Sequence, residues 1–204
     1  MTNPDSYKTI DQVSQGDFRD RGSKFPSYLF PCENEQQLKS FITELKKEHP
    51  GARHFCYGAI IGSRITEERN SDDGEPSGTA ELPILNQLLS KDLKNAGIVV
   101  IRYFGGTKLG KPGLINAYKE SARSAIDHAQ IVQKFHRTLV RFVFSYDATG
   151  SVMKTIENID HSAIVHQEFA QKCLVNVLIP DSLVEGTLPL FDHTDEVTVS
   201  IPGS

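Results

Sequence analysis

The sequence predicts a two-domain α+β protein, and three observations support this fold class. The chain has 204 residues, which is long for one domain and comfortable for two at roughly 100–200 residues per domain. Its composition turns polar around residues 130–136, where a second pattern of elements starts. The elements expected beyond that point follow the order βαββαβ, which is the ferredoxin-like unit. We therefore expect domains at residues 1–132 and 133–204.

The first domain is predicted to mix strands and helices. Residues 1–24 are polar and indicate a short strand or a partly ordered arm. Pro26 interrupts the aromatic run at 25–30, which therefore indicates an edge strand. Apolar residues spaced i, i+3, i+4 and i+7 predict a helix at 33–49. The elements expected next are a strand at 54–62, a polar loop at 64–79, a helix from 79 or 80 to 93, a buried strand at 98–104, a Gly-rich loop at 105–113 and a helix at 114–129.

The second domain is expected to begin with a strand at 137–145, where apolar side chains alternate. The elements expected after it are a helix at 147–158, strands at 161–169 and 172–179, a short helix at 181–190 and a last strand at 196–201. Their order is the basis of the ferredoxin-like prediction.

Composition and charge exclude several classes of protein. The net charge of −4 argues against a protein that coats nucleic acid or an anionic membrane through bulk positive charge. The cysteines, Cys32, Cys56 and Cys173, are odd in number and form no C-x-x-C pair, so neither a disulfide framework nor a zinc ribbon is expected. Reduced thiols fit a cytoplasmic protein. The sequence shows no signal peptide and no apolar run of membrane-spanning length, so no membrane partner is expected.

The second of two Gly-rich loops follows a buried strand and leads into a helix. Backbone N–H groups and a helix N-terminus converge in such a place and favour a bound anion. Residues 105–111 match the pattern G-x-x-x-x-G-K, but Pro112 replaces the Ser or Thr that a nucleotide-hydrolysing loop needs. The loop therefore predicts a site for a phosphate or a nucleic-acid backbone, unless its glycines only permit a tight connection. The candidate binding residues are Gly105, Gly106, Thr107, Lys108, Gly110 and Lys111.

Positive charge is concentrated around this loop. Residues 98–126 contain five basic residues and one acidic residue, a local charge of +4, whereas residues 181–204 contain five acidic residues and no Lys or Arg. Arg102 joins the candidate site because it lies in an otherwise apolar strand, where a charge is usually paired or functional. Lys119 and Arg123 are expected only to face solvent on a helix.

The first Gly-rich loop (72–80) is acidic, and its three carboxylates within four residues are those of Asp72, Asp73 and Glu75. Carboxylate oxygens could bind a divalent cation, or two carboxylates could perform acid–base chemistry if one pKa were displaced. They could instead form ion pairs with Arg102 or Lys108. Thr79 or Ser77 could cap the helix that follows. The sequence leaves these alternatives open, and whether a metal binds is unknown.

His54 and Cys56 share a strand at positions i and i+2, so both side chains face one side of the sheet. A Cys–His nucleophile pair is conceivable there. A packed strand with a hydrogen-bonded histidine is the commoner arrangement. His54 is kept as a further candidate, and the other histidines form no metal-binding pattern.

Several long motifs resemble the signature of the IMPACT family, in its bacterial YigZ-like branch. The motifs read RNSDDGEPSGTA at 69–80, PIL at 83–85, VIRYFGGTKLG at 100–110 and GL at 113–114. The resemblance opens with RGSKF at 21–25 and extends to about residue 130. Glu81 and Pro112 depart from the family pattern.

The resemblance implies a fold for each domain. The first should be similar to the second domain of ribosomal protein S5 and to the fourth domain of elongation factor G, and the second to the fifth domain of elongation factor G. Eukaryotic relatives regulate translation by competing for the activator of an amino-acid-sensing initiation-factor kinase. They do so with an extra N-terminal partner-binding domain that is not expected here, so that partnership is not carried over. The family has no agreed catalytic activity.

These observations favour a non-enzymatic, translation-related regulator that binds RNA or the ribosome through the basic Gly-rich loop. One alternative is an enzyme or binding protein for a phosphorylated small molecule, with its phosphate on residues 105–110 and with Asp72, Asp73 or Glu75 as metal ligand or base. Another is a protein-interaction module whose acidic C-terminal domain docks a partner or a second copy. The sequence indicates no cofactor and leaves the oligomeric state unknown.

Overall fold

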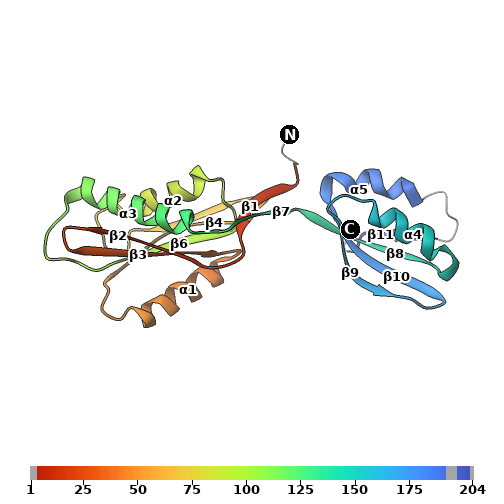
Figure 1. Cartoon of the computed structure of the whole chain (residues 1–204), viewed down its shortest axis with the longest axis horizontal. Coiled ribbons are helices and arrows are strands. Elements are labelled where there is room, and N and C mark those ends of the chain that lie inside the picture. The colour runs from red at the N-terminus through yellow and green to blue at the C-terminus, as the bar shows by residue number, and fades with distance from the viewer. Residues whose placement is uncertain (1–3, 192–196, 203–204) are drawn as a thin grey trace. The chain divides into compact units, whose positions relative to one another are not determined.

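The computed structural model describes residues 4–191 and 197–202. The chain forms two compact units, Tyr7–Lys134 and a second built from Phe135–Ser204 with the residues before Tyr7. The chain passes between them within β1 (Ser6–Ile10) and β7 (Ile131–Phe135), which pair with each other (Figure 1). That each unit folds independently, with a boundary near residue 132, stays a prediction. No helix within the described residues is long and apolar enough to cross a membrane.

The unit Tyr7–Lys134 is built around a five-stranded antiparallel sheet with the order β2-β3-β6-β4-β5. Helices α2 and α3 cover one face of this sheet and α1 covers the other (Figure 1). The elements are β2 (Ser14–Asp20), β3 (Ser23–Pro31), α1 (Glu35–Glu48), β4 (His54–Ile61), β5 (Glu67–Ser71), α2 (Glu81–Ser90), β6 (Ala96–Arg102) and α3 (Gly110–Asp127).

Side-chain alternation along β6 explains the three layers, because successive residues of a strand point to opposite faces. Ile98 and Val100 belong to the core under α2 and α3, whereas Val99 and Ile101 belong to the core under α1. Arg102 is the next residue, so the alternation directs its side chain to the face of α2 and α3. An arginine is thus placed at the end of a fully apolar strand, beneath the start of α3.

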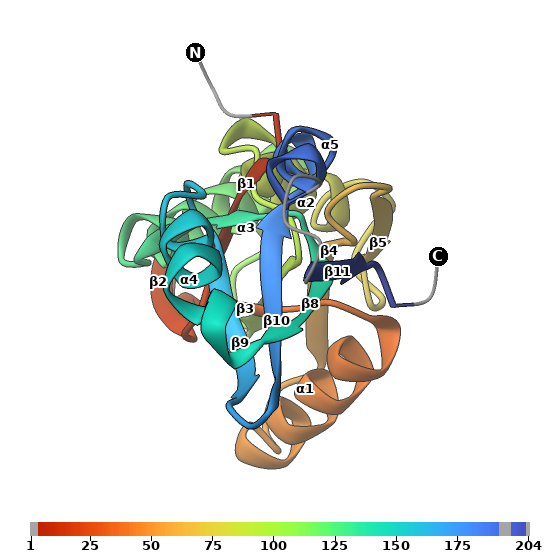
Figure 2. The same ribbon diagram turned by 90° about the vertical axis from the view of Figure 1, so that its right-hand side faces the viewer.

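The second unit contains a four-stranded antiparallel sheet with the order β11-β8-β10-β9 (Figure 2). Both of its helices share one core with β8 and β10, so they cover the same face. The βαββαβ order predicted from the sequence is confirmed. The elements are β8 (Arg137–Ser145), a short 3-10 helix (Tyr146–Ala148), α4 (Thr149–Glu157), β9 (Ala163–Glu168), β10 (Lys172–Pro180), α5 (Asp181–Thr187), a second 3-10 helix (Leu188–Phe191) and β11 (Val197–Ser200).

The prediction for the N-terminal residues is wrong in two respects. Residues 4–24 contain β1, β2 and the start of β3, not a single strand or an arm. β3 is also an inner strand, paired with both β2 and β6, although Pro26 indicated an edge. The ladder between β3 and β6 covers Ser27–Pro31 and resumes only at the bridge between Lys24 and Tyr103. Pro26 lies in this interruption, where its missing N–H breaks no ladder bond.

Two polar strands were not predicted. β5 lies in the expected loop at 64–79, and β7 lies in the polar stretch at 130–136. Both have mostly exposed or half-exposed residues on both faces, so they lack the apolar alternation that identifies a half-buried strand. The helix expected at 114–129 begins earlier, at Gly110, so Lys111 and Pro112 lie in its first turn.

Candidate functional site

The two Gly-rich loops line one pocket, of about 550 Å³. The strand directions explain why they meet. β5 and β6 both run antiparallel to β4, so both end beside its start, where His54 is paired with Arg102. The first loop leaves from β5 and the second from β6. This meeting could not be predicted from the sequence, because β5, from which the first loop leaves, is polar and lacks apolar alternation.

Glu75 of the first loop forms a buried ion pair with Arg102. Nη1 of Arg102 donates to Oε1 of Glu75 at 2.6 Å, and the two side chains are 9% and 4% exposed. The hydroxyl of Tyr118, on α3, donates to the same oxygen at 2.9 Å. Of the alternatives that the sequence left open for this loop, the structure has the ion pair to Arg102. These bonds offset the desolvation that burying two charges costs.

Arg102 is nevertheless incompletely bonded. Among the described residues, its buried Nε–H has no hydrogen-bond partner. A buried donor without a partner costs about 1–3 kcal/mol, so such a group in a folded protein points to a water molecule or a ligand. Its guanidinium also lies 5.7 Å from the ring centre of Phe25 and 5.5 Å from that of Phe104. Phe104 is 61% exposed, so the pocket presents an accessible aromatic side chain beside this charge.

The start of α3 adds positive potential to the pocket. Leu109 at its N-cap makes no side-chain hydrogen bond, and the first turn contains no acidic residue. The first N–H groups of a helix have no partner within it, and its dipole favours an anion there. Lys108 and Lys111 on either side are exposed, and the exposed Arg53 also lines the pocket. In all, four basic side chains line the pocket against one carboxylate.

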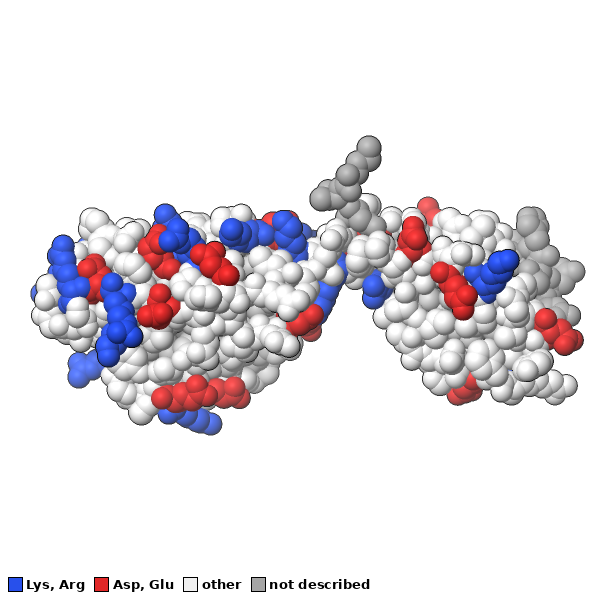
Figure 3. All heavy atoms as spheres, in the orientation of Figure 1, with Lys and Arg blue, Asp and Glu red and all other residues white. Residues whose placement is uncertain are grey.

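The distribution of basic and acidic side chains on one face of the unit Tyr7–Lys134 is visible in Figure 3. In the view of Figure 3, Lys and Arg side chains gather at the end of the unit Tyr7–Lys134 where the chain passes from β6 into α3 (Figure 1). Acidic side chains are interspersed elsewhere on the same face. Of the basic residues in segment 98–126, Arg102, Lys108 and Lys111 line the pocket, whereas Lys119 and Arg123 lie further along α3. Arg123 forms an ion pair with Glu120, as expected for a residue on a solvated helix face.

Gly105, Gly106 and Thr107 do not line the pocket, although the sequence placed them in the site. Gly105 packs against the turn between β2 and β3, where a Cβ would overlap the carbonyl carbon of Gly22. Its N–H donates to the hydroxyl of Ser23 at 3.1 Å. Gly106 has open space around it but a φ of 89°, which favours glycine. These two glycines shape the loop, whereas Lys108, Gly110 and Lys111 face the pocket.

Asp72 stabilises the first loop and caps α2. Its Oδ1 accepts from the N–H groups of Ala80 and Glu81 at 2.8 and 2.9 Å, and its Oδ2 accepts from Gly78 at 2.7 Å. The prediction that Thr79 or Ser77 caps this helix is wrong, because the cap comes from a residue eight positions before Ala80. The buried Thr79 donates instead to the carbonyl of Pro76, at 2.6 Å.

Asp73 ties the loop to β4, since its Oδ2 accepts from the N–H of Phe55 at 2.7 Å. Each carboxylate of the loop therefore has its own protein partners, with Glu75 bound to Arg102. Within the described residues no group of three or more His, Cys, Asp or Glu side chains is placed to hold a metal ion.

His54 lines the pocket, and Cys56 lies behind it in the core. Nδ1 of His54 is 2.9 Å from the carbonyl oxygen of Asp73. The thiol of Cys56 donates to the carbonyl of Asp72 and contacts the hydroxyl of Tyr118, at 3.0 and 3.3 Å. Burial raises the pKa of Cys56 far above its ordinary value, which keeps it a thiol and not a nucleophile. A Cys–His nucleophile pair is therefore not supported. His54 is instead a hydrogen-bonded histidine on a packed strand.

Besides the apolar lining residues, one charged and two aromatic residues of the site were not proposed from the sequence. Arg53 and Phe104 line the pocket, and Tyr118 completes the network around Glu75. A signal for Phe104 existed: it follows Arg102 by two residues, the spacing that puts two strand side chains on one face. No comparable signal marks Tyr118, whose place on the buried stripe of α3 resembles that of any core aromatic residue.

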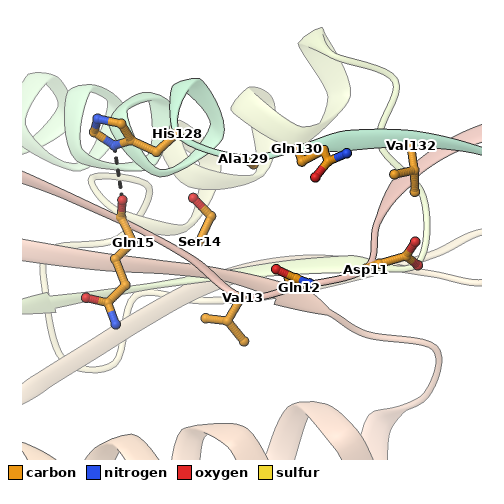
Figure 4. A pocket seen from close by; sticks show the side chains of 9 residues that line it. All are labelled: Asp11, Gln12, Val13, Ser14, Gln15, His128, Ala129, Gln130 and Val132. Carbon is orange, nitrogen blue, oxygen red and sulfur yellow. Dashed lines mark hydrogen bonds between the residues drawn. The ribbon is translucent and has the colours of Figure 1, made fainter.

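A second pocket, of about 510 Å³, lies at the other end of α3 in the same unit (Figure 4). It is lined by residues 11–15 and by His128, Ala129, Gln130 and Val132. Nδ1 of His128 is 3.1 Å from the carbonyl oxygen of Gln15, and the carboxylate of Asp11 pairs with Lys134 at 2.6 Å. The charged group of this lining is thus already paired, so the pocket lacks the unmatched charge of the first.

Comparison with known proteins gives consistent matches. The family model described as the Impact N-terminal domain matches residues 21–126. IMPACT family member YvyE of Bacillus subtilis (strain 168) is 39% identical over 147 residues, which are 72% of this chain and 68% of YvyE. IMPACT family member YigZ of Escherichia coli (strain K12) is 29% identical over 164 residues, 79% of this chain and 80% of YigZ.

A solved structure of a hypothetical protein is similar over nearly the whole length. The match covers 97% of each chain with a TM-score of 0.69 and 25% sequence identity. The mixed α/β fold with two units therefore occurs in a solved protein as well.

Proposed function

We propose that this chain, which belongs to the IMPACT family as its match to the family model over residues 21–126 shows, is a translation-related regulator without catalytic activity. It would bind RNA, free or in the ribosome, at the pocket between its two Gly-rich loops. The observation that carries this proposal is the excess of positive charge in the pocket. Four basic side chains and an uncapped helix start face one carboxylate, and that carboxylate is already paired with Arg102.

RNA offers the chemistry that this lining can bind. Its phosphates would accept hydrogen bonds from Lys108, Lys111 and the first N–H groups of α3. An unstacked base could rest on the exposed ring of Phe104, since aromatic side chains beside basic ones form the usual platform for single strands. The net charge of −4 then confines the interaction to this part of the surface.

We also propose the finer folds that the family resemblance implies. The first unit would be similar to the second domain of ribosomal protein S5, and the second unit to the fifth domain of elongation factor G. The βαββαβ order supports the latter. A cytoplasmic location is supported by the three cysteines, none of which forms a disulfide in the described residues.

A partner for the C-terminal unit remains a further proposal. Of the acids that motivated it, Asp192, Asp195 and Glu196 lie outside the described residues. Asp181 begins α5 and accepts from the hydroxyl of Thr138 at 2.8 Å.

An enzyme acting on a phosphorylated small molecule gains less support from the same loops. Such an enzyme would need Asp72, Asp73 or Glu75 as a base or a metal ligand. Asp72 accepts hydrogen bonds from backbone N–H groups of its own loop, and Asp73 accepts one from β4. Glu75 is paired with Arg102. Their hydrogen bonds already account for the fold of the loop.

The test is RNA binding by a Lys108→Ala, Lys111→Ala double variant. We expect its affinity for single-stranded RNA at low salt to fall about 10-fold or more, and its salt slope to decrease by about 1.4, because each lost single-strand phosphate contact removes about 0.7. Fluorescence anisotropy at several salt concentrations measures both, and ribosome co-sedimentation adds a second readout.

A Lys47→Ala, Lys91→Ala variant is the matched control, since it removes the same charge from exposed positions outside the pocket. Equal RNA affinity of the unchanged protein and the Lys108→Ala, Lys111→Ala variant would contradict the proposed function. An equal loss of RNA affinity in both variants would also contradict it, because binding would then depend on the overall charge of the protein and not on this pocket.

A further inference from the structure

The pocket is small compared with the surface that a nucleic-acid backbone needs. Its volume of about 550 Å³ lies within the roughly 300–1,000 Å³ typical of pockets that enclose one small ligand. A duplex or an extended strand presents successive phosphates along a surface, and sites for it follow grooves. A pocket of this size fits one nucleotide.

The pocket lining has more positively charged side chains than negatively charged ones. Against the single carboxylate of Glu75 stand Arg53, Arg102, Lys108 and Lys111. A phosphodiester inside a strand carries one negative charge, whereas a terminal phosphomonoester carries about −1.5 to −2 at pH 7 and has three strong acceptor oxygens. The lining therefore matches a terminal phosphate better than an internal one.

Two independent observations point to a ligand at this position. One is the uncapped start of α3 at Gly110, whose N–H groups favour an anion. The other is Arg102, which lines the pocket, is 9% exposed and keeps a buried Nε–H without a partner among the described residues. The helix start alone would be an ordinary feature, but Arg102 adds to the same pocket a donor that is closed to solvent and has no partner among the described residues.

The remaining lining suits the rest of a nucleotide. Pro76, Leu109 and Leu114 provide apolar surface, and Phe104 provides an exposed aromatic ring beside the Arg102 guanidinium. Base stacking on aromatic side chains is tolerant of sequence, because every base has a π-face.

We propose that this pocket binds the terminal nucleotide of a single-stranded RNA, with its phosphomonoester between Arg102 and the start of α3 and its base on Phe104. This inference rests on the proposed function and deepens it, since it replaces contact along the backbone with recognition of a phosphorylated strand end. A free nucleoside monophosphate has the same chemistry, and the experiment separates the two sources.

The test compares binding of RNAs of identical sequence and about twelve nucleotides, within the range that single-strand sites accommodate. One carries a 5′-phosphate, one a 3′-phosphate, and one has hydroxyl groups at both ends. We expect one phosphorylated strand to bind the full-length protein about 10-fold more tightly than the hydroxyl strand, the size of effect that one well-paired charged contact provides. Nucleoside monophosphate should compete only at much higher concentration.

Variants locate the effect. Lys111→Ala is expected to abolish the preference for the phosphorylated strand, and Phe104→Ala to weaken binding of all strands. Phe169→Ala is the control, because Phe169 is also exposed but lies in the second unit. A preference for phosphate that persists in Lys111→Ala would overturn the assignment to this pocket, and an unchanged affinity of Phe104→Ala would overturn the place of the base.

The outcomes also distinguish this inference from the proposed function. If phosphorylated and hydroxyl strands bind equally, and both bindings require Lys108 and Lys111, strand-end recognition is wrong and the proposed function stands. If no strand binds, both are wrong. If free nucleoside monophosphate binds as tightly as the phosphorylated strand, the site belongs to small nucleotides and recognition of an RNA end is overturned.

Discussion

Replacing Glu75 with Ala is expected to lower the free energy of unfolding by about 3–5 kcal/mol, the range for removing one partner of a buried ion pair. The variant would leave the Arg102 guanidinium buried without its carboxylate, and it would also remove the acceptor of the Tyr118 hydroxyl. Urea denaturation of the full-length protein, followed by circular dichroism, measures the loss.

Two further variants make this result specific. Glu44→Ala removes a carboxylate from an exposed position of α1 and is expected to change stability little. Arg102→Met added to Glu75→Ala is expected to recover part of the loss, because it removes the uncompensated buried charge. A loss for Glu75→Ala no larger than that of Glu44→Ala would contradict the role assigned to the ion pair.

Replacing Gly105 with Ala is expected to destabilise the protein by about 2–3 kcal/mol, in the range of overpacking in a close contact. The new Cβ would overlap the backbone of Gly22, so either the second loop or the turn between β2 and β3 must move. Thermal unfolding and RNA affinity should both report this displacement, because Lys108 and Lys111 belong to the same loop.

Gly106→Ala provides the matched comparison. Its Cβ would meet no atom within 4 Å, so the penalty comes only from the φ of 89°, and we expect about 1–2 kcal/mol. A smaller effect for Gly105→Ala than for Gly106→Ala would show that the contact between the two turns is not needed.

The fold could be predicted from the sequence where apolar side chains follow a regular period. The helix α1, the buried strand β6 and the elements of the second unit all lie within a few residues of their expected ranges. β5 and β7 could not be predicted, because their residues are polar and lack apolar alternation. In addition, β7 pairs with β1, which lies more than a hundred residues earlier in the sequence. The prediction of an edge strand from Pro26 was wrong for a related reason. Its missing N–H lies in an interruption of the ladder between β3 and β6, which is known only from the strand register.

Several residues of the candidate site could be predicted from the sequence, but the contacts between them could not. Arg102 could be predicted, because a charge in an otherwise apolar strand is usually paired or functional, and Glu75 is its partner. The roles of Asp72 and Asp73 could not be assigned from the sequence. A carboxylate that caps a helix whose N-cap lies eight positions later has the same local sequence as one that binds a metal. The pocket itself depends on the parallel directions of β5 and β6, which no local pattern shows.

The central claim, that the pocket between the two Gly-rich loops binds RNA phosphate, is tested most directly by NMR titration of the ¹⁵N-labelled full-length protein with 5′- and 3′-phosphorylated RNA. We predict that the Nε–H resonance of Arg102 and the backbone N–H resonances of Lys111 and Gly113 shift together, with one dissociation constant, on addition of one of these strands. RNA binding that leaves these three resonances unchanged while residues elsewhere shift would contradict the account.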